Sequence, residues 1–110
     1  MEMMIINAHD VKVVTIGGDI DGANAEEAQE QLGQILRSGG KILLDMRRVD
    51  YLSSAGLRVL LSVYRQLTPS GGNLGLVGLS DEITETLETT GLIRFFKVYD
   101  DVDAGLAALK

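Results

Sequence analysis

Two adjacent serines, Ser53 and Ser54, are the residues whose position most clearly favours chemistry. They lie between an apolar run typical of a strand, residues 41–46, and a segment from Leu57 to Leu67 in which apolar residues recur at helical spacing. A serine at the start of a helix can accept a hydrogen bond from an unpaired N–H of the first turn, beside the positive end of the helix dipole. This environment suits a negative charge, including one added as phosphate. An ordinary strand-to-helix loop with a serine cap remains the alternative at this point.

Other kinds of chemistry have less support in the sequence. His9 is the only histidine, and a catalytic pair would require it to lie across the fold from one of the serines; no Gly-x-Ser-x-Gly motif supports such a pair. Carboxylates on predicted loops and strand ends would gather at one edge of a parallel sheet, but no spacing among them requires magnesium. They are Asp19, Asp21, Asp45 and Asp50. We therefore predict no catalytic residue, no metal site and no cofactor.

The composition is that of one globular domain of 110 residues, with 45% apolar and 24% charged residues. Cysteine is absent, which excludes disulfides and thiolate metal sites, and no apolar run approaches the about 20 residues of a membrane-spanning helix. The chain has 10 Lys and Arg against 16 Asp and Glu, a formal charge of −6. We expect a cytoplasmic protein that binds neither nucleic acid nor a membrane, and whose acidic surface favours a basic protein partner.

Strands and helices are predicted to alternate along the chain. Apolar or β-branched runs predict strands over residues 3–6, 11–16, 41–46, 73–78 and 95–99. Helical spacing predicts four helices: one capped by Asn24 with Glu27 and ending at residues 38–40, one ending before Pro69, one from Ser80 to Gly91, and one beginning at Asp100 or Asp101. The order ββαβαβαβα indicates an α/β fold, with a mostly parallel sheet of about five strands and about four helices, in which the first two strands are antiparallel.

The segment from Tyr51 to Leu60, with the sequence YLSSAGLRVL, resembles the phosphorylation loop of STAS domains, the family of bacterial anti-sigma factor antagonists. The family pattern is Asp-Ser-Ser-Gly-Leu or Asp-Ser-Thr-Gly-Leu, and the hydroxyl after the aspartate is the phosphorylated one. That hydroxyl falls on Ser54, the aspartate falls on Ser53, and the second hydroxyl falls on Ala55; Gly56 and Leu57 match.

Two further segments extend the resemblance over the whole chain. Residues 18–21, Gly-Asp-Ile-Asp, are similar to the family's Gly-x-x-Asp turn, and residues 90–92, Thr-Gly-Leu, followed by Phe95 and Phe96, are similar to its late Thr-Gly-Leu segment. Three matches in the right order are more specific than the serine loop alone. Residues 1–110 are therefore identified as one STAS domain.

The resemblance implies an anti-sigma factor antagonist, a regulator rather than an enzyme. It would bind an anti-sigma factor when Ser54 is unphosphorylated, be phosphorylated there by an anti-sigma factor serine kinase, and be reset by a metal-dependent serine phosphatase. The implied partner-binding residues are Asp21, Ser53, Ser54, Gly56 and Arg58. A weak homodimer is a further partner to be tested.

A second hypothesis belongs to a different class. Ser53 replaces the family aspartate, and this favours a sensory or scaffold STAS module that binds a small ligand or a signalling complex without being phosphorylated. Incubation with ATP and a candidate kinase would separate the two hypotheses.

Overall fold

The structure, a computed structural model, describes residues 1–37 and 39–109. Within them the elements follow the predicted order ββαβαβαβα, which is confirmed. They are β1 (Glu2–Ala8), β2 (Val11–Gly17), α1 (Ala25–Leu36), β3 (Lys41–Arg48), α2 (Ser54–Leu67), β4 (Asn73–Val77), α3 (Asp81–Thr90), β5 (Lys97–Tyr99) and α4 (Val102–Leu109), with short 3₁₀ helices η1 (Thr68–Ser70) and η2 (Leu92–Phe95). Ser38, in the predicted stop of the first helix, lies outside the described residues.

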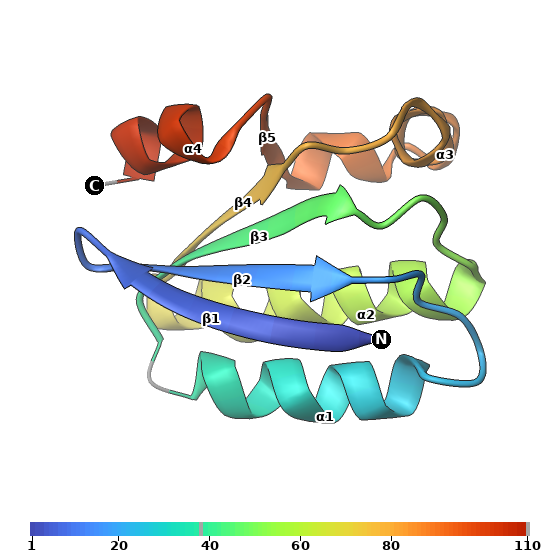
Figure 1. Cartoon of the computed structure of the whole chain (residues 1–110), viewed down its shortest axis with the longest axis horizontal. Helices are drawn as coiled ribbons and strands as arrows, with labels where there is room; N and C mark the ends of the chain where they lie inside the picture. The colour runs from blue at the N-terminus through green and yellow to red at the C-terminus, as the bar shows by residue number, and fades with distance from the viewer. Residues whose placement is uncertain (38, 110) are drawn as a thin grey trace.

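The sheet has the strand order β1-β2-β3-β4-β5, so neighbours in sequence are also neighbours in space (Figure 1). β1 is antiparallel to β2, and every other pair is parallel, as predicted. The β1–β2 turn places His9 and Asp10 at positive φ, 52° and 67°, which suits the twist of a tight hairpin. β3 is central, and its residues 42–46 are all buried, as expected of a strand covered on both faces.

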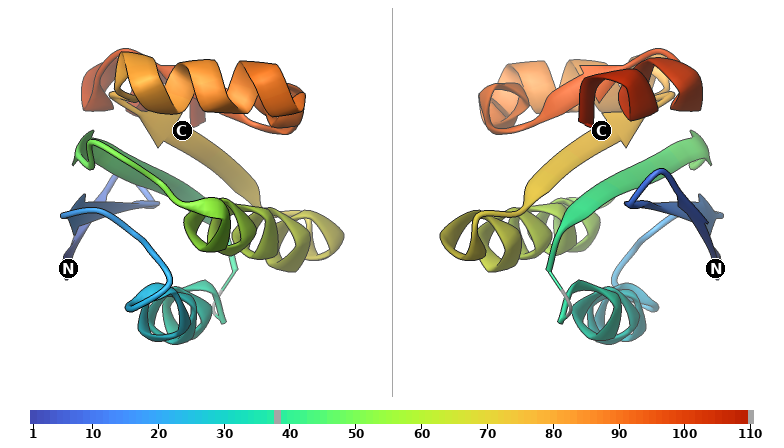
Figure 2. Two further views of the ribbon diagram at one scale, coloured as in Figure 1. Left: turned by 90° about the vertical axis from the view of Figure 1, so that its right-hand side faces the viewer. Right: turned by 90° about the vertical axis from the view of Figure 1, so that its left-hand side faces the viewer.

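Helices cover both faces of the sheet (Figure 2). α1 and α2 lie side by side on one face, where Leu32 and Leu60 pack into the main core with Leu44 of β3. α4 covers the other face, where Leu109 packs against Leu43 in a smaller cluster. Because successive residues of a strand point to opposite faces, the consecutive leucines of β3 supply both cores. No helix of the described residues is long and apolar enough to cross a membrane.

The predicted fifth strand begins too early in the sequence. Residues 92–95 form η2, and β5 contains only residues 97–99. Tyr64 of α2 explains the difference, since its ring lies 5.5 Å from that of Phe95 and 5.9 Å from that of Phe96. These aromatic contacts hold Phe95 in a helical turn, and tertiary packing overrides the strand propensity of the two phenylalanines.

The predicted reciprocal cap of the first helix is wrong. The Asn24 side chain makes no capping hydrogen bond; its Oδ1 accepts from Asp21 N (3.0 Å) and its Nδ2 donates to the Asp19 carbonyl (3.0 Å). Glu27 accepts a hydrogen bond from Gln31 instead of reaching back to Asn24. Asp21 Oδ1 accepts from Ala23 N (2.9 Å) and Asn24 N (3.3 Å). The Asp21 carboxylate, four residues before the helix, therefore organises this entry, because it accepts from the Asn24 N–H that Glu27 was expected to bind.

Candidate functional site

Three loops meet at the edge of the sheet where the parallel strands end (Figure 1). They join β2 to α1, β3 to α2 and β4 to α3. The carboxyl ends of parallel strands share one edge, which is where ligand and partner sites of α/β folds usually lie. The loop between β3 and α2 holds the two serines singled out in the sequence.

Asp19 joins the first of these loops to the second. Its Oδ1 accepts hydrogen bonds from Asp50 N (2.9 Å) and Tyr51 N (3.0 Å). The Ile20 carbonyl accepts from Ser53 N (3.1 Å), and an isolated parallel bridge pairs Ile20 with Leu52. The backbone that leads into α2 is therefore fixed by the loop after β2.

The two serines have different environments. Ser53 is the N-cap of α2 and is half-buried; its Oγ accepts from Gly56 N (3.3 Å) and donates to the Ile20 carbonyl (3.4 Å). Ser54 is the first residue of α2 and is exposed, and its hydroxyl forms no hydrogen bond with any residue of the described ranges. The Ser53 hydroxyl is therefore engaged in capping α2, whereas the Ser54 hydroxyl is exposed to solvent.

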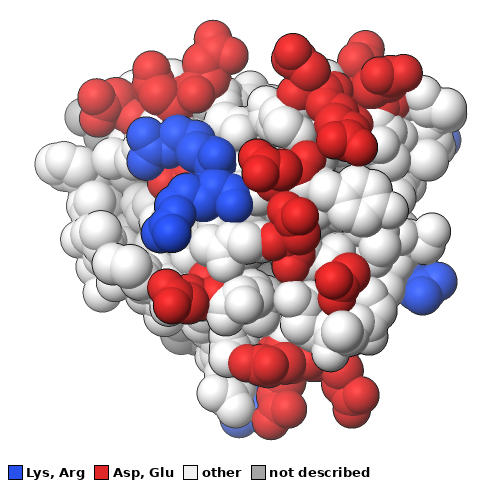
Figure 3. Space-filling view, turned by 45° about the vertical axis from the view of Figure 1, so that its right-hand side comes forward, with Lys and Arg blue, Asp and Glu red and all other residues white. Residues whose placement is uncertain are grey.

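The start of α2 carries no acidic residue in its first turn, whereas α1 has Glu26 and Glu27 there and α3 has Asp81 and Glu82. The first turn of α2 thus contributes no negative charge of its own to the positive end of the helix dipole. Figure 3 shows acidic side chains spread over this side of the molecule and one compact basic cluster among them. Arg58, one helical turn after Ser54, is exposed.

Gly56 is buried, and its lack of a side chain allows α2 to approach the loop after β2. A Cβ placed there would lie 2.7 Å from the Ile20 carbonyl oxygen and 3.1 Å from Leu52 Cδ2. The backbone oxygen has no room to move, because it also accepts the hydrogen bond from Ser53 N. Of the predicted partner-binding residues, Ser54 and Arg58 are exposed and form no side-chain hydrogen bond within residues 1–37 and 39–109. Asp21 is exposed but hydrogen-bonded, and Gly56 allows the backbone of α2 to approach the neighbouring loop.

The third loop joins the site through Ser80. Its Oγ donates to the Asp50 carbonyl (3.1 Å) while it accepts from Ile83 N (3.1 Å) as the cap of α3. Sequence analysis predicted that Ser80 caps this helix, but it did not predict the hydrogen bond to Asp50. Tyr51, which follows Asp50 in the same loop, leaves 47% of its surface exposed. Its place in the site was not predicted, although the presence of an aromatic residue in this loop was the available signal.

The buried Asp45 is paired with Arg47. Arg47 Nη2 lies 2.8 Å from Asp45 Oδ2, and Nε lies 3.0 Å from Oδ1. Burial alone raises the pKa of the Asp45 carboxyl, but the hydrogen bonds and charge of Arg47 outweigh it, so that the pKa lies below its usual value. Two other carboxylates, Asp19 and Asp21, accept backbone N–H groups. Among residues 1–37 and 39–109, no group of three or more acidic, histidine or cysteine side chains is placed to hold a metal ion.

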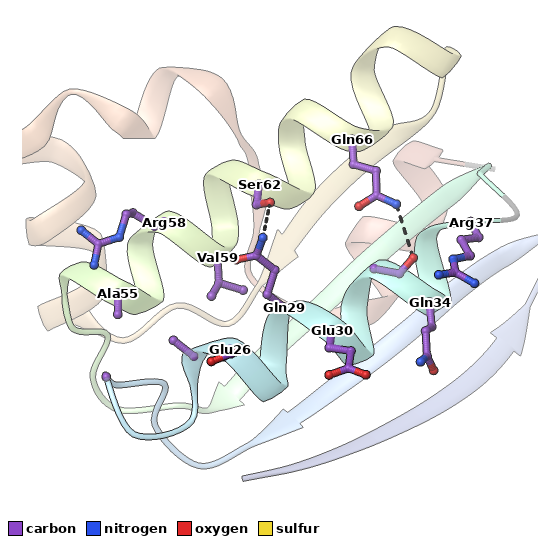
Figure 4. Close-up of a pocket in the computed structure, with 13 residues that line it drawn as sticks. Glu26, Gln29, Glu30, Gln34, Arg37, Ala55, Arg58, Val59, Ser62 and Gln66 are labelled. Atoms are coloured by element: carbon purple, nitrogen blue, oxygen red, sulfur yellow. Dashed lines mark hydrogen bonds between the residues drawn. The ribbon is translucent and has the colours of Figure 1, made fainter.

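A groove of about 840 Å³ runs between α1 and α2, and its end at Ala55 and Arg58 adjoins Ser54 (Figure 4). It is crossed by a hydrogen bond from Gln29 to Ser62 (3.1 Å) and by one from Gln66 to the Gly33 carbonyl (3.3 Å). The groove is open and polar, so a protein bound over Ser54 can continue onto it.

Comparison with known proteins agrees with this architecture. A sequence model described as the STAS domain matches residues 2–105. BtrV of Bordetella bronchiseptica, provisionally named an anti-sigma factor antagonist, is 36% identical over 99 residues, which cover 89% of this chain and 85% of BtrV. The anti-sigma-B factor antagonist of Bacillus subtilis is 30% identical over 86 residues, 78% of each chain.

A solved structure agrees as well. The crystal structure of an anti-sigma factor antagonist from Mycobacterium paratuberculosis superposes with a TM-score of 0.88 at 26% identity, covering 98% of this chain and 92% of that one. The loop linked by Asp19, the capping Ser53 and the exposed Ser54 thus lie on a fold shared with these proteins. The chain belongs to the STAS domain family, among relatives that are anti-sigma factor antagonists.

Proposed function

We propose that this protein is an anti-sigma factor antagonist that acts by phosphorylation-dependent partner switching. With Ser54 unphosphorylated, it binds an anti-sigma factor, which then releases its sigma factor. A serine kinase, the anti-sigma factor itself, phosphorylates Ser54 and ends the contact, and a metal-dependent serine phosphatase restores it. The protein is a cytoplasmic regulator that supplies the acceptor hydroxyl and performs no chemistry of its own. Its family membership and the names of its relatives support this class.

The observation that carries the proposal is the difference between the two serines. A kinase needs a hydroxyl that can enter its active site, and Ser54 is exposed with its hydroxyl unengaged by the described residues. Ser53 is half-buried, and its hydroxyl is held at 3.3 Å from Gly56 N. Ser54 also occupies the family's acceptor position. Phosphorylation of Ser53 would require the cap of α2 to open, whereas Ser54 requires no rearrangement.

The same geometry accounts for the switch. The partner surface consists of Ser54 and Arg58 on α2, Asp21 on the neighbouring loop, and the backbone that Ser53 and Gly56 hold in place. A phosphate adds about −1.5 to −2 charges at the centre of this surface. In the free protein, water and the start of α2 solvate that charge. Against a partner surface shaped for a small hydroxyl, the charge loses water and binding fails.

The test measures phosphorylation first. The protein is incubated with a candidate anti-sigma factor serine kinase of its source organism, ATP and Mg²⁺, and the phosphopeptides are mapped by mass spectrometry. We expect phosphate on Ser54, none in Ser54→Ala, and unchanged modification of Ser54 in Ser53→Ala. Phosphate on Ser53 alone would show that the acceptor lies one residue earlier than proposed.

Calorimetry with the same kinase then measures binding. We expect Ser54→Ala to bind like the parent and Ser54→Asp to bind at least about tenfold more weakly, or about 1.4 kcal/mol. Thr89→Asp is the matched control, because it adds the same charge at an exposed position of α3. Equal affinity for all four proteins would refute partner switching and leave the scaffold module as the better explanation.

A further inference from the structure

β1 forms an open edge of the sheet. It pairs with β2 through seven residues, and no strand of the described residues lies on its other side (Figures 1 and 2). Its centre is apolar and exposed: Met4, Ile5 and Ile6 leave 57%, 49% and 56% of their surfaces in solvent. An exposed strand of this length carries a row of unpaired N–H and C=O groups and serves as a template for another strand.

The opposite edge of the sheet is protected in the usual ways. β5 has only three residues, and it begins with an exposed lysine, Lys97. Short edge strands, lysines, prolines and bulges all prevent edge-to-edge pairing. β1 has none of these, since its register with β2 runs unshifted from Glu2 opposite Gly17 to Ala8 opposite Val11, and Glu2 is its one charged residue. The protection is missing at one edge and present at the other.

We propose that β1 pairs antiparallel with β1 of a second copy, joining two sheets into one of ten strands. A two-fold axis at Ile5 sets Ile5 opposite its own copy and Met4 opposite Ile6 of the second chain, twice over. Successive residues alternate between faces, so this arrangement pairs apolar side chains on both faces of the joined sheet. The two Glu2 side chains lie at opposite ends and each faces Ala8. The strand is therefore complementary to itself in shape, polarity and charge, as an isologous contact requires.

The size of the surface determines the strength of the pair. Seven residues at about 3.3 Å each give a strip about 23 Å long. Such a strip buries far less than the about 800 Å² per partner of a standard interface. The hollow of about 540 Å³ beside β1, lined by Ile5 of β1 and by Gln34 and Ile35 of α1, offers further surface on one face. The dimer is accordingly weak and forms with rising protein concentration.

The pairing leaves the serine surface free. α2, whose first residue is Ser54, begins at the edge of the sheet where the parallel strands end, not along the outer side of β1 (Figure 1). In the antiparallel pair, the two Ser54 surfaces face away from each other. The dimer can therefore present two partner sites at once, and its existence does not depend on the proposed function.

Sedimentation velocity of the purified chain tests the proposal, over concentrations from about 10 µM to about 1 mM, the range of weak contacts. We expect the dimer fraction of the parent to rise through this range. Ile5→Lys places a charge at the axis and should weaken the dimer at least about tenfold, since like charges directly opposite are destabilising. Val98→Lys, at the other edge where Val98 is 42% exposed, should dimerise like the parent. Circular dichroism checks that both variants are folded.

Cross-linking locates the contact independently of folding stability. The chain has no cysteine, so Ile5→Cys introduces the single thiol. We expect oxidation to give a disulfide-linked dimer with Ile5→Cys and a monomer with Val98→Cys. A parent that stays monomeric up to about 1 mM, or an Ile5→Lys variant that dimerises as well as the parent, would overturn the proposal.

Discussion

α2 and α3 begin in closely similar ways and differ in what their first turns carry. Each follows a parallel strand and a short loop, and each is capped by a serine whose Oγ accepts from the third residue of the helix, Gly56 in α2 and Ile83 in α3. At the first helical position, α3 has Asp81, which suits the dipole, whereas α2 has Ser54.

The two helix starts therefore differ in whether their first turn carries a negative charge. The start of α3 has its negative charge permanently, and its capping serine is also tied to Asp50. The start of α2 has the same N–H groups and dipole but only a hydroxyl at the place where a charge would be favourable. Under the proposed function, a phosphate on Ser54 would supply the negative charge that the first turn of α2 lacks. The predictions below perturb one helix start and use the other as reference.

The third helical position should give the largest effect. Gly56→Val places a branched side chain against the Ile20 carbonyl, and a Cβ there would lie only 2.7 Å from that oxygen. We expect the free energy of unfolding to fall by about 3 kcal/mol or more, at the top of the range for overpacked positions. Urea unfolding followed by circular dichroism measures it. Gly33→Ala in α1, where nothing lies within 4 Å, is the control and should change stability by less than about 1 kcal/mol.

The second effect concerns the connection between the two helix starts. Arg47, held by Asp45, packs over Gly78 in the loop that leads to α3. Asp45→Asn removes the charge from this hydrogen-bonded pair and should cost about 1.5–3 kcal/mol at pH 7.

The pH dependence of Asp45 has a definite sign. Because the pKa of Asp45 is lower in the folded protein, the unfolded chain binds a proton first as the pH falls. This contribution to stability is complete above the unfolded pKa of about 4 and is lost as the pH falls through the lower folded pKa. Urea unfolding at a series of pH values should show a steeper acid loss for the parent than for Asp45→Asn; parallel curves would contradict the assignment.

Asp19 fixes the entry to α2 without touching α3. Asp19→Ala leaves the Asp50 and Tyr51 N–H groups without their acceptor at 2.9 and 3.0 Å, and we expect a loss of about 1–2 kcal/mol. Asp19→Asn keeps one acceptor oxygen and should recover at least half of the loss. Hydrogen exchange provides the second measurement, since the amides of Asp50 and Tyr51 should exchange faster while those of α3 stay protected.

The two caps compare the helices directly. Ser80→Ala should cost more than Ser53→Ala, because the Ser80 hydrogen bonds are both 3.1 Å long while those of Ser53 are 3.3 and 3.4 Å. Both losses should fall within about 0.5–2 kcal/mol. Thermal unfolding of the two variants measures them, and the reverse order would show that the weaker contacts of Ser53 carry more of the stability.

The smallest effect exchanges the first helical residues. Ser54→Asp should stabilise the protein by about 0.3–1 kcal/mol, and Asp81→Ser should destabilise it by a similar amount. Both differences should shrink in high salt, because both positions are exposed. If Ser54→Asp destabilises the protein, the start of α2 is not the favourable site for negative charge that the comparison indicates.

Much of this arrangement could be predicted because the relevant signals are local. The serine caps of α2 and α3 and the consecutive leucines of β3 follow from neighbouring residues and turn chemistry. One failure depends on a contact between distant residues, since Phe95 takes a helical turn because Tyr64 lies against it. The other is local: Asn24 Oδ1 accepts from Asp21 N instead of capping α1, and Asp21 Oδ1 accepts from the Asn24 N–H that Glu27 was expected to bind.

The candidate site was selected by resemblance, and its hydrogen bonds could not be predicted from the sequence. The sequence identified Ser53 and Ser54 as a pair, and only the structure separates them by burial and hydrogen bonding. Asp19 was a loop carboxylate with no assigned role, since its partners are 31 and 32 residues away. Gly56 was expected among the partner-binding residues, and the approach of Ile20 from another loop buries it.

The strand order β1-β2-β3-β4-β5 bears on how the protein is made. Because each strand adds beside the one synthesised before it, the sheet can grow in the order in which the ribosome delivers the chain. The link from Asp19 to the β3–α2 loop, the cap of Ser53 and the α1–α2 pair all lie within the first 67 residues. The contacts that hold the start of α2 are thus encoded mostly in the first 67 residues, and a later segment of the chain adds the hydrogen bond from Ser80 to the Asp50 carbonyl.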